Sequence, residues 1–288
     1  MKTVKITMWL FALLCCHLVT SQKSNETISK VLNFSTKSDQ NRLVVKNING
    51  PIRVEGYDGS AIRLEAEKSI SAKRESYLEE GKQEIKIKIE ELNNRIYVYV
   101  ETPNNNFNTA SGRYENSRNN RWVKLDYRFH VSFTLKVPKS TSVELATMND
   151  GDIYAKDVQG NEIIVNNLNG AITLENIAGK TDVNALNKDI NITYYKNPNG
   201  DSKYHSLNGD VNVTFQEKLN ADVSFKSLNG DMYTNYDTTA LKPELVKSKS
   251  KNGKGIKYNM SANQSYRIGK GGIRLDFNLL NGDATLKK

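Results

Sequence analysis

The chain has 288 residues and a formal net charge of +9, from 41 Lys and Arg against 32 Asp and Glu. Its only cysteines are Cys15 and Cys16, so disulfide-stabilised folds and thiol chemistry are excluded for everything that follows them. Such a basic balance would favour nucleic-acid binding in a cytosolic protein. The N-terminal segment argues against that location, and we expect Lys and Arg to occupy solvated outward strand positions, with no nucleic-acid partner.

The N-terminal segment, residues 1–21, predicts export. A basic start at Lys2 and Lys5 precedes an almost purely apolar run over residues 6–19, and small residues follow. This pattern is typical of a signal peptide (1–21) and is too short to span a bilayer. Lipid anchoring at Cys15 or Cys16 is the alternative, but a small residue precedes neither. With no later apolar run, we expect no transmembrane span and a periplasmic, cell-surface or secreted location.

Residues 22–40 are rich in Asn and Ser and predict a flexible lead. The next part, 41–141, is expected to be β-rich, because Leu43–Val54 contains an Asn-Gly pair and is an early copy of the repeated phrase found after residue 142. A short surface helix is predicted near residues 71–80, where Lys, Glu, Tyr and Leu replace β-branched residues. A hairpin should follow, with strands at 84–90 and 95–100 joined by Asn93 and Asn94.

The remainder of this N-terminal part is expected to contain a loop and one long strand. Residues 102–120 are rich in Asn, Ser and Arg and nearly devoid of aliphatic side chains, which predicts an exposed loop. Trp122–Val137 then alternates as a strand and stops at Pro138.

From residue 142 to residue 288 the sequence repeats a short phrase. Tyr204–Val213 reads YHSLNGDVNV, and the next copy, Phe225–Thr234, reads FKSLNGDMYT. Related copies lie upstream and downstream, at a spacing of about 20 residues. The Asn-Gly corners should adopt positive φ; the corner residues are Asn49, Gly50, Gly151, Asn169, Gly170, Asn208, Gly209, Asn229, Gly230, Asn281 and Gly282.

The spacing of these copies favours a solenoid. A hairpin meander should repeat every 10 residues or so, whereas a coil that stacks on itself needs roughly 20 or more. We therefore predict an all-β fold, a parallel β-solenoid of about 20-residue coils, each with two strands and two corners. A lysine-rich insertion at 237–265 interrupts the array, and a last copy around Ile268–Phe277 is expected to close it.

Several of these segments resemble one family. The run Val54–Gly59, the strand Val131–Pro138, the serial Leu-Asn-Gly-Asp phrases and the closing Gly269–Leu275 are similar to the DUF4097 family of secreted bacterial proteins. The resemblance spans roughly residues 40 to 288. It implies an adhesin built from β-strand repeats, related to the head domain of autotransporter adhesins, and supplies no catalytic residues.

The acidic residues that follow the corners are the main candidates for a chemical site: Asp152, Asp210, Asp231 and Asp283. Stacked in a row, they could bind Ca²⁺ or supply the acid pair of a glycosidase. The simpler interpretation, which we favour, is that each caps its own turn. No cofactor or metal is predicted.

Catalytic motifs are absent from the sequence. His130 and His205 each lie in a predicted strand without a partner motif, and no zinc-protease, nucleophile-elbow or P-loop pattern occurs. The repeat tyrosines are expected to pack within the solenoid, although outward ones could face a sugar; they are Tyr194, Tyr195, Tyr204, Tyr233 and Tyr236.

The predicted function is therefore a non-enzymatic secreted or cell-envelope β-repeat protein, an adhesin-like binding or scaffold module. Its expected partners are surface glycans or other envelope components. The alternative is a polysaccharide-active β-helix enzyme, a lyase or glycosidase, which would need convergent carboxylates in a cleft. A third option is end-to-end assembly through unpaired solenoid edges.

Overall fold

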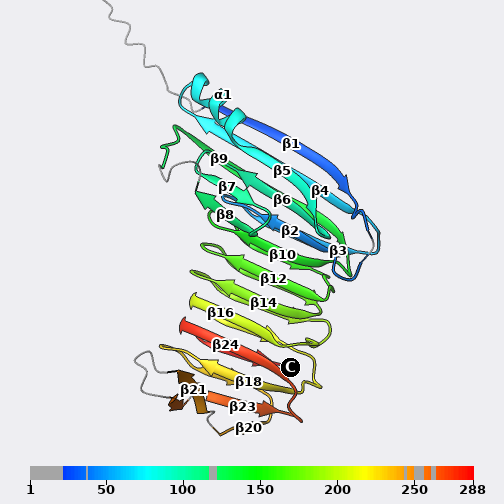
Figure 1. Cartoon of the computed structure of the whole chain (residues 1–288), viewed down its shortest axis with the longest axis vertical. Coiled ribbons are helices and arrows are strands. Elements are labelled where there is room, and N and C mark those ends of the chain that lie inside the picture. Colours follow the sequence, from blue (N-terminus) through cyan, green and yellow to red (C-terminus); the bar gives the residue numbers. More distant parts are fainter. Residues whose placement is uncertain (1–21, 37, 117–121, 243–244, 250–255, 261–263) are drawn as a thin grey trace, which may run out of the picture.

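The computed structural model describes residues 22–36, 38–116, 122–242, 245–249, 256–260 and 264–288. The predicted signal peptide, with Cys15 and Cys16, lies outside them. The protein is a β-solenoid whose strands stack along its long axis (Figure 1). Its two long sheets enclose one apolar core. This confirms the fold class predicted from the repeat spacing.

Each sheet is a stack of strands that do not follow sequence order. The first sheet contains, in spatial order, β1 (Gln22–Leu32), β4 (Ile62–Ala72), β9 (Tyr127–Pro138), β3 (Ile52–Tyr57), β11 (Ile153–Lys156), β13 (Ile172–Ile177), β15 (Ile190–Tyr194), β17 (Val211–Thr214), β25 (Ala284–Lys287) and β19 (Met232–Thr234). The second sheet contains β20 (Thr238–Ala240), β23 (Gln264–Ile268), β18 (Ala221–Lys226), β24 (Ile273–Asn281), β16 (Ser202–Asn208), β14 (Lys180–Ala185), β12 (Glu162–Asn167), β10 (Ser142–Thr147), β2 (Arg42–Lys46), β6 (Arg95–Glu101) and β5 (Lys86–Leu92).

The repeating unit is a rung, defined here as a strand of the second sheet, an Asn-containing corner and a strand of the first sheet. In the described parts of the chain seven rungs stack in parallel, in the order β2–β3, β10–β11, β12–β13, β14–β15, β16–β17, β24–β25 and β18–β19. The period of two in the sequence sends alternate residues into the core. One inward row is Val45, Leu145, Val165, Val183, Tyr204, Phe277 and Phe225, each at most 5% exposed. Each such buried side chain contributes roughly 1.5 to 3 kcal/mol to folding.

The stack is continuous across residue 142, where the sequence suggested a division. Ser142–Ala146 of β10 pairs in register with Arg42–Lys46 of β2, and β11 pairs with β3. The N-terminal copy of the repeat is therefore an integral rung of the same solenoid.

The last copy of the repeat does not close the array, contrary to the prediction. The rung β24–β25 lies between β16–β17 and β18–β19, although it follows both in the sequence (Figure 1). Its strand also begins at Ile273, because Gln264–Ile268 forms β23 on the far side of β18. The end rung of the described stack is therefore β18–β19.

Antiparallel strands cover the N-terminal end of the first sheet. The prediction of a flexible lead is wrong for Gln22–Leu32, which forms β1 and pairs with β4 over its whole length. Its side chains are mostly exposed, so β1 is held by backbone pairing with β4, which leaves no apolar pattern in its sequence. β4 in turn pairs antiparallel with β9.

The single helix among the described residues, α1 (Glu75–Glu84), lies four residues later than predicted. The chain up to Ala72 remains in β4, because Ile70 and Ala72 are buried there. Buried Lys68 holds the helix end in place: its ammonium lies 3.3 Å from the carbonyl oxygens of Lys82 and Ile85 and 2.7 Å from the Glu26 carboxylate of β1. The helix and β1 thus form one cap.

The predicted hairpin is confirmed as β5 and β6, with Asn93 and Asn94 both at positive φ. The predicted loop at 102–120 is wrong for its described part, which contains a second hairpin, β7 (Asn105–Asn108) and β8 (Arg113–Asn116). Phe107 anchors this hairpin against Tyr99, with ring centroids 4.9 Å apart. The long strand β9 begins at Tyr127, five residues after Trp122.

The lysine-rich insertion contains strands of its own. β20 pairs with β23, and β21 (Leu245–Lys249) pairs with β22 (Ile256–Met260). Within the described residues, no helix has the length and apolarity needed to cross a membrane.

Candidate functional site

The corner glycines allow the rungs to stack closely. Gly50, Gly209, Gly230 and Gly282 have φ between +123° and +155°, a region that other residues rarely adopt. Two more corner glycines lack positive φ but lie against backbone: a Cβ on Gly151 would be 2.1 Å from the carbonyl carbon of Gly50, and one on Gly170 would be 2.0 Å from the Gly151 oxygen. Glycine is therefore needed for close approach between rungs as well as for φ.

The corner asparagines do not adopt the predicted positive φ. They form an asparagine ladder instead, in which each side-chain amide donates a hydrogen bond to the amide oxygen of the preceding rung, over 2.7 to 3.3 Å. The ladder runs through Asn49, Asn149, Asn169, Asn187, Asn208, Asn281 and Asn229. It lies along one edge of the solenoid and links all seven rungs.

The carboxylates of Asp152, Asp210 and Asp283 cap neighbouring rungs, which corrects the expectation that each caps its own turn. Asp152 accepts a hydrogen bond from the backbone N–H of Ala171 at 2.8 Å, and Asp210 accepts one from Asp283 at 2.9 Å. Asp283 likewise accepts from Asp231 in the end rung at 2.8 Å. Among the residues with described coordinates, no group of three or more His, Cys, Asp or Glu could hold a metal ion.

This geometry predicts that Asp210 acts as a hydrogen-bond acceptor. Asp210→Asn keeps an acceptor oxygen, so its melting temperature should stay close to that of the parent chain. Asp210→Ala should lower it, because the N–H of Asp283 loses its partner. Thermal unfolding of the two variants side by side is the measurement. Equal losses for Asn and Ala would show that the negative charge matters instead.

A row of exposed apolar side chains runs beside the asparagine ladder. The residue before each ladder asparagine from the second rung onward is Met148, Leu168, Leu186, Leu207, Leu280 and Leu228. Four of these leucines are between 36% and 72% exposed, with Leu228 at the upper limit. We call this set the leucine row.

The next outward row on the second sheet is largely uncharged. It consists of Ala146, Asn166, Asn184, His205, Asn278 and Lys226, which pair in register from rung to rung. We call it the amide row. Between Leu186 and Leu228 it borders a shallow groove of about 530 Å³, the leucine groove. Within the groove the His205 Nε2 atom is buried and has no hydrogen-bond partner among the residues that the structure describes.

Lining residues of the leucine groove include no carboxylate and one cation: Asn184, Leu186, His205, Ser206, Leu207, Lys226, Ser227, Leu228, Asn278, Leu279 and Leu280. Leucine side chains offer apolar contact, while the amides of Asn184 and Asn278 can both donate and accept hydrogen bonds. The groove therefore matches an uncharged ligand with apolar and hydroxyl or amide groups better than an ionic one.

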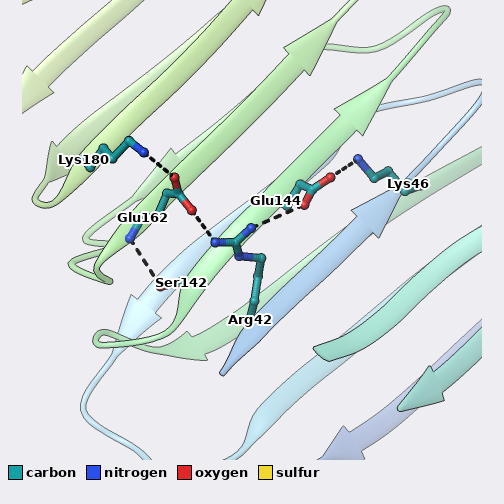
Figure 2. A network of polar contacts seen from close by, with 6 residues as sticks. All are labelled: Arg42, Lys46, Ser142, Glu144, Glu162 and Lys180. Atoms are coloured by element: carbon teal, nitrogen blue, oxygen red, sulfur yellow. Dashed lines mark hydrogen bonds and ion pairs between the residues drawn. The ribbon is translucent and has the colours of Figure 1, made fainter. Parts of the chain in front are cut away.

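Acidic and basic side chains come together elsewhere on the second sheet (Figure 2). Arg42 pairs with both Glu144 and Glu162; Lys46 lies 2.6 Å from Glu144, and Lys180 lies 3.0 Å from Glu162. Burial raises the pKa of Glu162, but the hydrogen bond from Lys180 and the charge of Arg42 lower it more, so the net shift is downward. Glu162 thus stays ionised, whereas a glycosidase acid needs a raised pKa. These ion pairs join four consecutive strands, from β2 to β14.

The tyrosines divide between core and surface. Tyr194 and Tyr204 are buried, with their hydroxyls 2.7 Å apart and both in contact with Thr181. Burial raises the pKa of Tyr204 to about 12 and that of Tyr194 well above its ordinary value. Tyr236 is also buried, at 9% exposure, whereas Tyr195 and Tyr233 are more than half exposed. His130 is exposed and lies far in the stack from His205.

Sequence reasoning noted the leucine of each Leu-Asn-Gly phrase but missed its surface role. The sequence did contain the necessary pattern. Leu207 is an even number of residues from Lys203 and His205, which point outward, and an odd number from Tyr204, which is buried. An outward leucine in several copies of one repeat indicates an exposed apolar row.

Two solved structures align with most of this chain at low identity. A solved structure of a "putative cell adhesion protein" from Clostridium sporogenes aligns with 92% of this chain and 99% of its own, at 10% identity and a TM-score of 0.44. A "putative adhesin" from Bacteroides fragilis aligns with 91% of this chain and 96% of its own, at 9% identity and a TM-score of 0.31. No curated protein matches.

The family comparison covers most of the rungs. The model of the DUF4097 family, described as Toastrack, matches residues 132–276, half of the chain. That range begins within β9 and ends within β24, so it contains five rungs from β10–β11 to β18–β19 apart from the inserted one. The chain belongs to the DUF4097 (Toastrack) family.

Proposed function

We propose that this protein is a non-enzymatic adhesin-like binding module, secreted or held in the cell envelope, and that the leucine groove with its flanking rows is its binding surface. The observation that carries the proposal is an apolar row bordered on both sides by amide side chains without a carboxylate. The names of the two similar solved structures point the same way. Export rests on the signal-like segment at residues 1–21.

An uncharged surface glycan fits these groups. The sugar ring offers an apolar C–H face to leucine, while its hydroxyls can pair with Asn184, Asn278 and the asparagine ladder. The groups recur once per rung, so an extended polymer meets the same contact several times. Individually weak contacts in series give useful avidity.

The enzymatic alternative, a polysaccharide lyase or glycosidase, needs convergent carboxylates in a cleft. The groove-lining residues contain none, and the carboxylates of Glu144 and Glu162 are held in ion pairs. The non-enzymatic proposal therefore has the stronger support.

A glycan-array screen on the chain from Gln22, paired with reducing-end release on the same polysaccharides, tests the proposal. Binding without release is expected. The double variant Leu207→Asp/Leu228→Asp should weaken binding by about tenfold or more, equivalent to at least about 1.4 kcal/mol. Both leucines are exposed, so the fold should survive.

The control is Thr193→Asp, at an outward, exposed position on the first sheet, and it is compared with the single variant Leu207→Asp, which adds the same charge. It adds one negative charge away from the groove and should leave binding unchanged. Equal loss in both variants would show that charge, and not the groove, matters. Sugar release would overturn the non-enzymatic assignment, and silence in both assays would count against glycan binding.

A further inference from the structure

The C-terminal rung has two equivalent neighbours. Phe277 of β24 pairs in register with Tyr204 of β16 on one side and with Phe225 of β18 on the other. The rung β18–β19 carries the same phrase as β16–β17, one repeat later in the sequence. Three rungs with one repeated sequence thus stand side by side, with the last in the chain between the other two.

The two interfaces also use the same hydrogen bonds. Asn281 donates to Asn208 at 2.7 Å, and Asn229 donates to Asn281 at 2.7 Å. The backbone N–H of Asp283 bonds to the Asp210 carboxylate, and that of Asp231 bonds to the Asp283 carboxylate. Asn229 and Asp231 carry the same amide and backbone N–H groups as Asn281 and Asp283. The rung β18–β19 can therefore stack directly on β16–β17 when the C-terminal rung is not inserted between them.

The C-terminal segment pairs with both edges of β18. β23 pairs antiparallel with one edge of β18 and β24 pairs parallel with the other. The link between them crosses the start of β18, where the N–H of Lys270 bonds to the Asn220 side chain at 2.8 Å. Gly269, Gly271 and Gly272 take positive φ in this crossing. We call Gln264–Lys288 the clip.

We propose that the clip is exchangeable between two copies of this chain, so that the clip of one copy inserts between β16 and β18 of the other. All rung-to-rung contacts of the monomer recur in such a dimer, because the inserted sequence and its register are the same. The exchange therefore costs no interface, and rising concentration favours it.

Single-cysteine variants test the exchange. The chain from Gln22 contains every described element and no cysteine. Lys226→Cys on β18 and Asn278→Cys on β24 are outward, exposed and directly paired in register. Neighbouring parallel strands bring such residues within disulfide range. The two variants are mixed at high concentration, warmed below the melting temperature, cooled and oxidised.

The matched control is a mixture of Asn166→Cys and Asn184→Cys, which occupy the same amide row on β12 and β14, inside the continuous part of the stack. Exchange predicts a several-fold excess of the Lys226→Cys/Asn278→Cys heterodimer over that of the control mixture. The double variant carrying both cysteines, oxidised beforehand, should lock its own clip and abolish exchange with labelled parent chain. Equal heterodimer yields in the two mixtures, or no exchange between labelled and unlabelled parent chains, would overturn the proposal.

Discussion

Gly209→Val is expected to lower the free energy of unfolding by at least about 3 kcal/mol, combining strain at positive φ with a backbone clash. Gly209 has a φ of +155°, and a Cβ there would lie 2.5 Å from the carbonyl carbon and oxygen of Lys188 in the adjacent rung. Neither atom can move without separating the two rungs. Urea unfolding followed by circular dichroism would measure the loss.

Gly200→Ala is the control for this prediction. Gly200 lies at the opposite corner of the rungs and lacks positive φ, and the atoms nearest to an added Cβ would be those of the Lys180 side chain, at 3.7 Å or more. The substitution should be nearly neutral. A Gly209→Val chain that unfolds at the same urea concentration as the parent would contradict the need for glycine at the corner.

The solenoid could be predicted because its repeat appears in both spacing and alternation. Val165, Val183 and Tyr204 recur at nearly equal intervals, and each precedes an asparagine corner by the same interval or nearly so. Such a pattern sets both the inward phase and the parallel stacking. The β5–β6 hairpin could also be predicted, because Asn93 and Asn94 separate two runs in which apolar and polar residues alternate.

The order of the rungs could not be predicted, because the copies carry equivalent groups. Phe225 and Phe277 are interchangeable as neighbours of Tyr204, so the local sequence does not say which copy lies next to β16. The difference comes from the far side of β18: β23 covers that edge and the short link to Ile273 returns the chain to the near edge. Rung order is thus set by the clip.

Elements held by backbone pairing or by distant partners were also invisible to sequence reasoning. β1 has exposed or half-buried side chains only, because it pairs with the outer edge of β4. The β7–β8 hairpin depends on Phe107 meeting Tyr97 and Tyr99 of β6. Likewise, the Asp210 carboxylate was expected to serve its own turn, but its acceptor role involves Asp283, which lies far along the chain in the inserted rung.

The leucine groove likewise depends on segments that are far apart in the sequence. A single Leu-Asn-Gly phrase is only a corner; the leucine row and the asparagine ladder exist because parallel stacking aligns the phrases. The residues of the leucine row and the asparagine ladder could therefore be identified from the sequence. The groove between Leu207 and Leu228 could not, because it depends on the inserted rung with Leu280.

Phe277→Ala should cost about 3 to 5 kcal/mol of global stability, the usual range for removing a buried phenylalanine. Phe277 is fully buried and stacks on Tyr204, with ring centroids 4.6 Å apart. Because its rung lies inside the stack, the cavity should weaken contacts with β16 and β18 together. Urea unfolding measures the total loss of stability, and hydrogen exchange at the amides of both neighbouring strands shows where in the stack the loss occurs.

Asn278→Ala is the matched control, since it changes the next, outward and exposed residue of the same strand, and its effect should stay within about 0.5 kcal/mol. The strands in which Phe277→Ala speeds hydrogen exchange distinguish between two positions for the C-terminal rung. A rung at the end of the array would fray alone, so only β24 and β25 would lose protection. An inserted rung transmits the loss to β18, which then exchanges faster although it lies far upstream of Phe277 in the sequence. Faster exchange confined to residues 273–288 would contradict the inserted position.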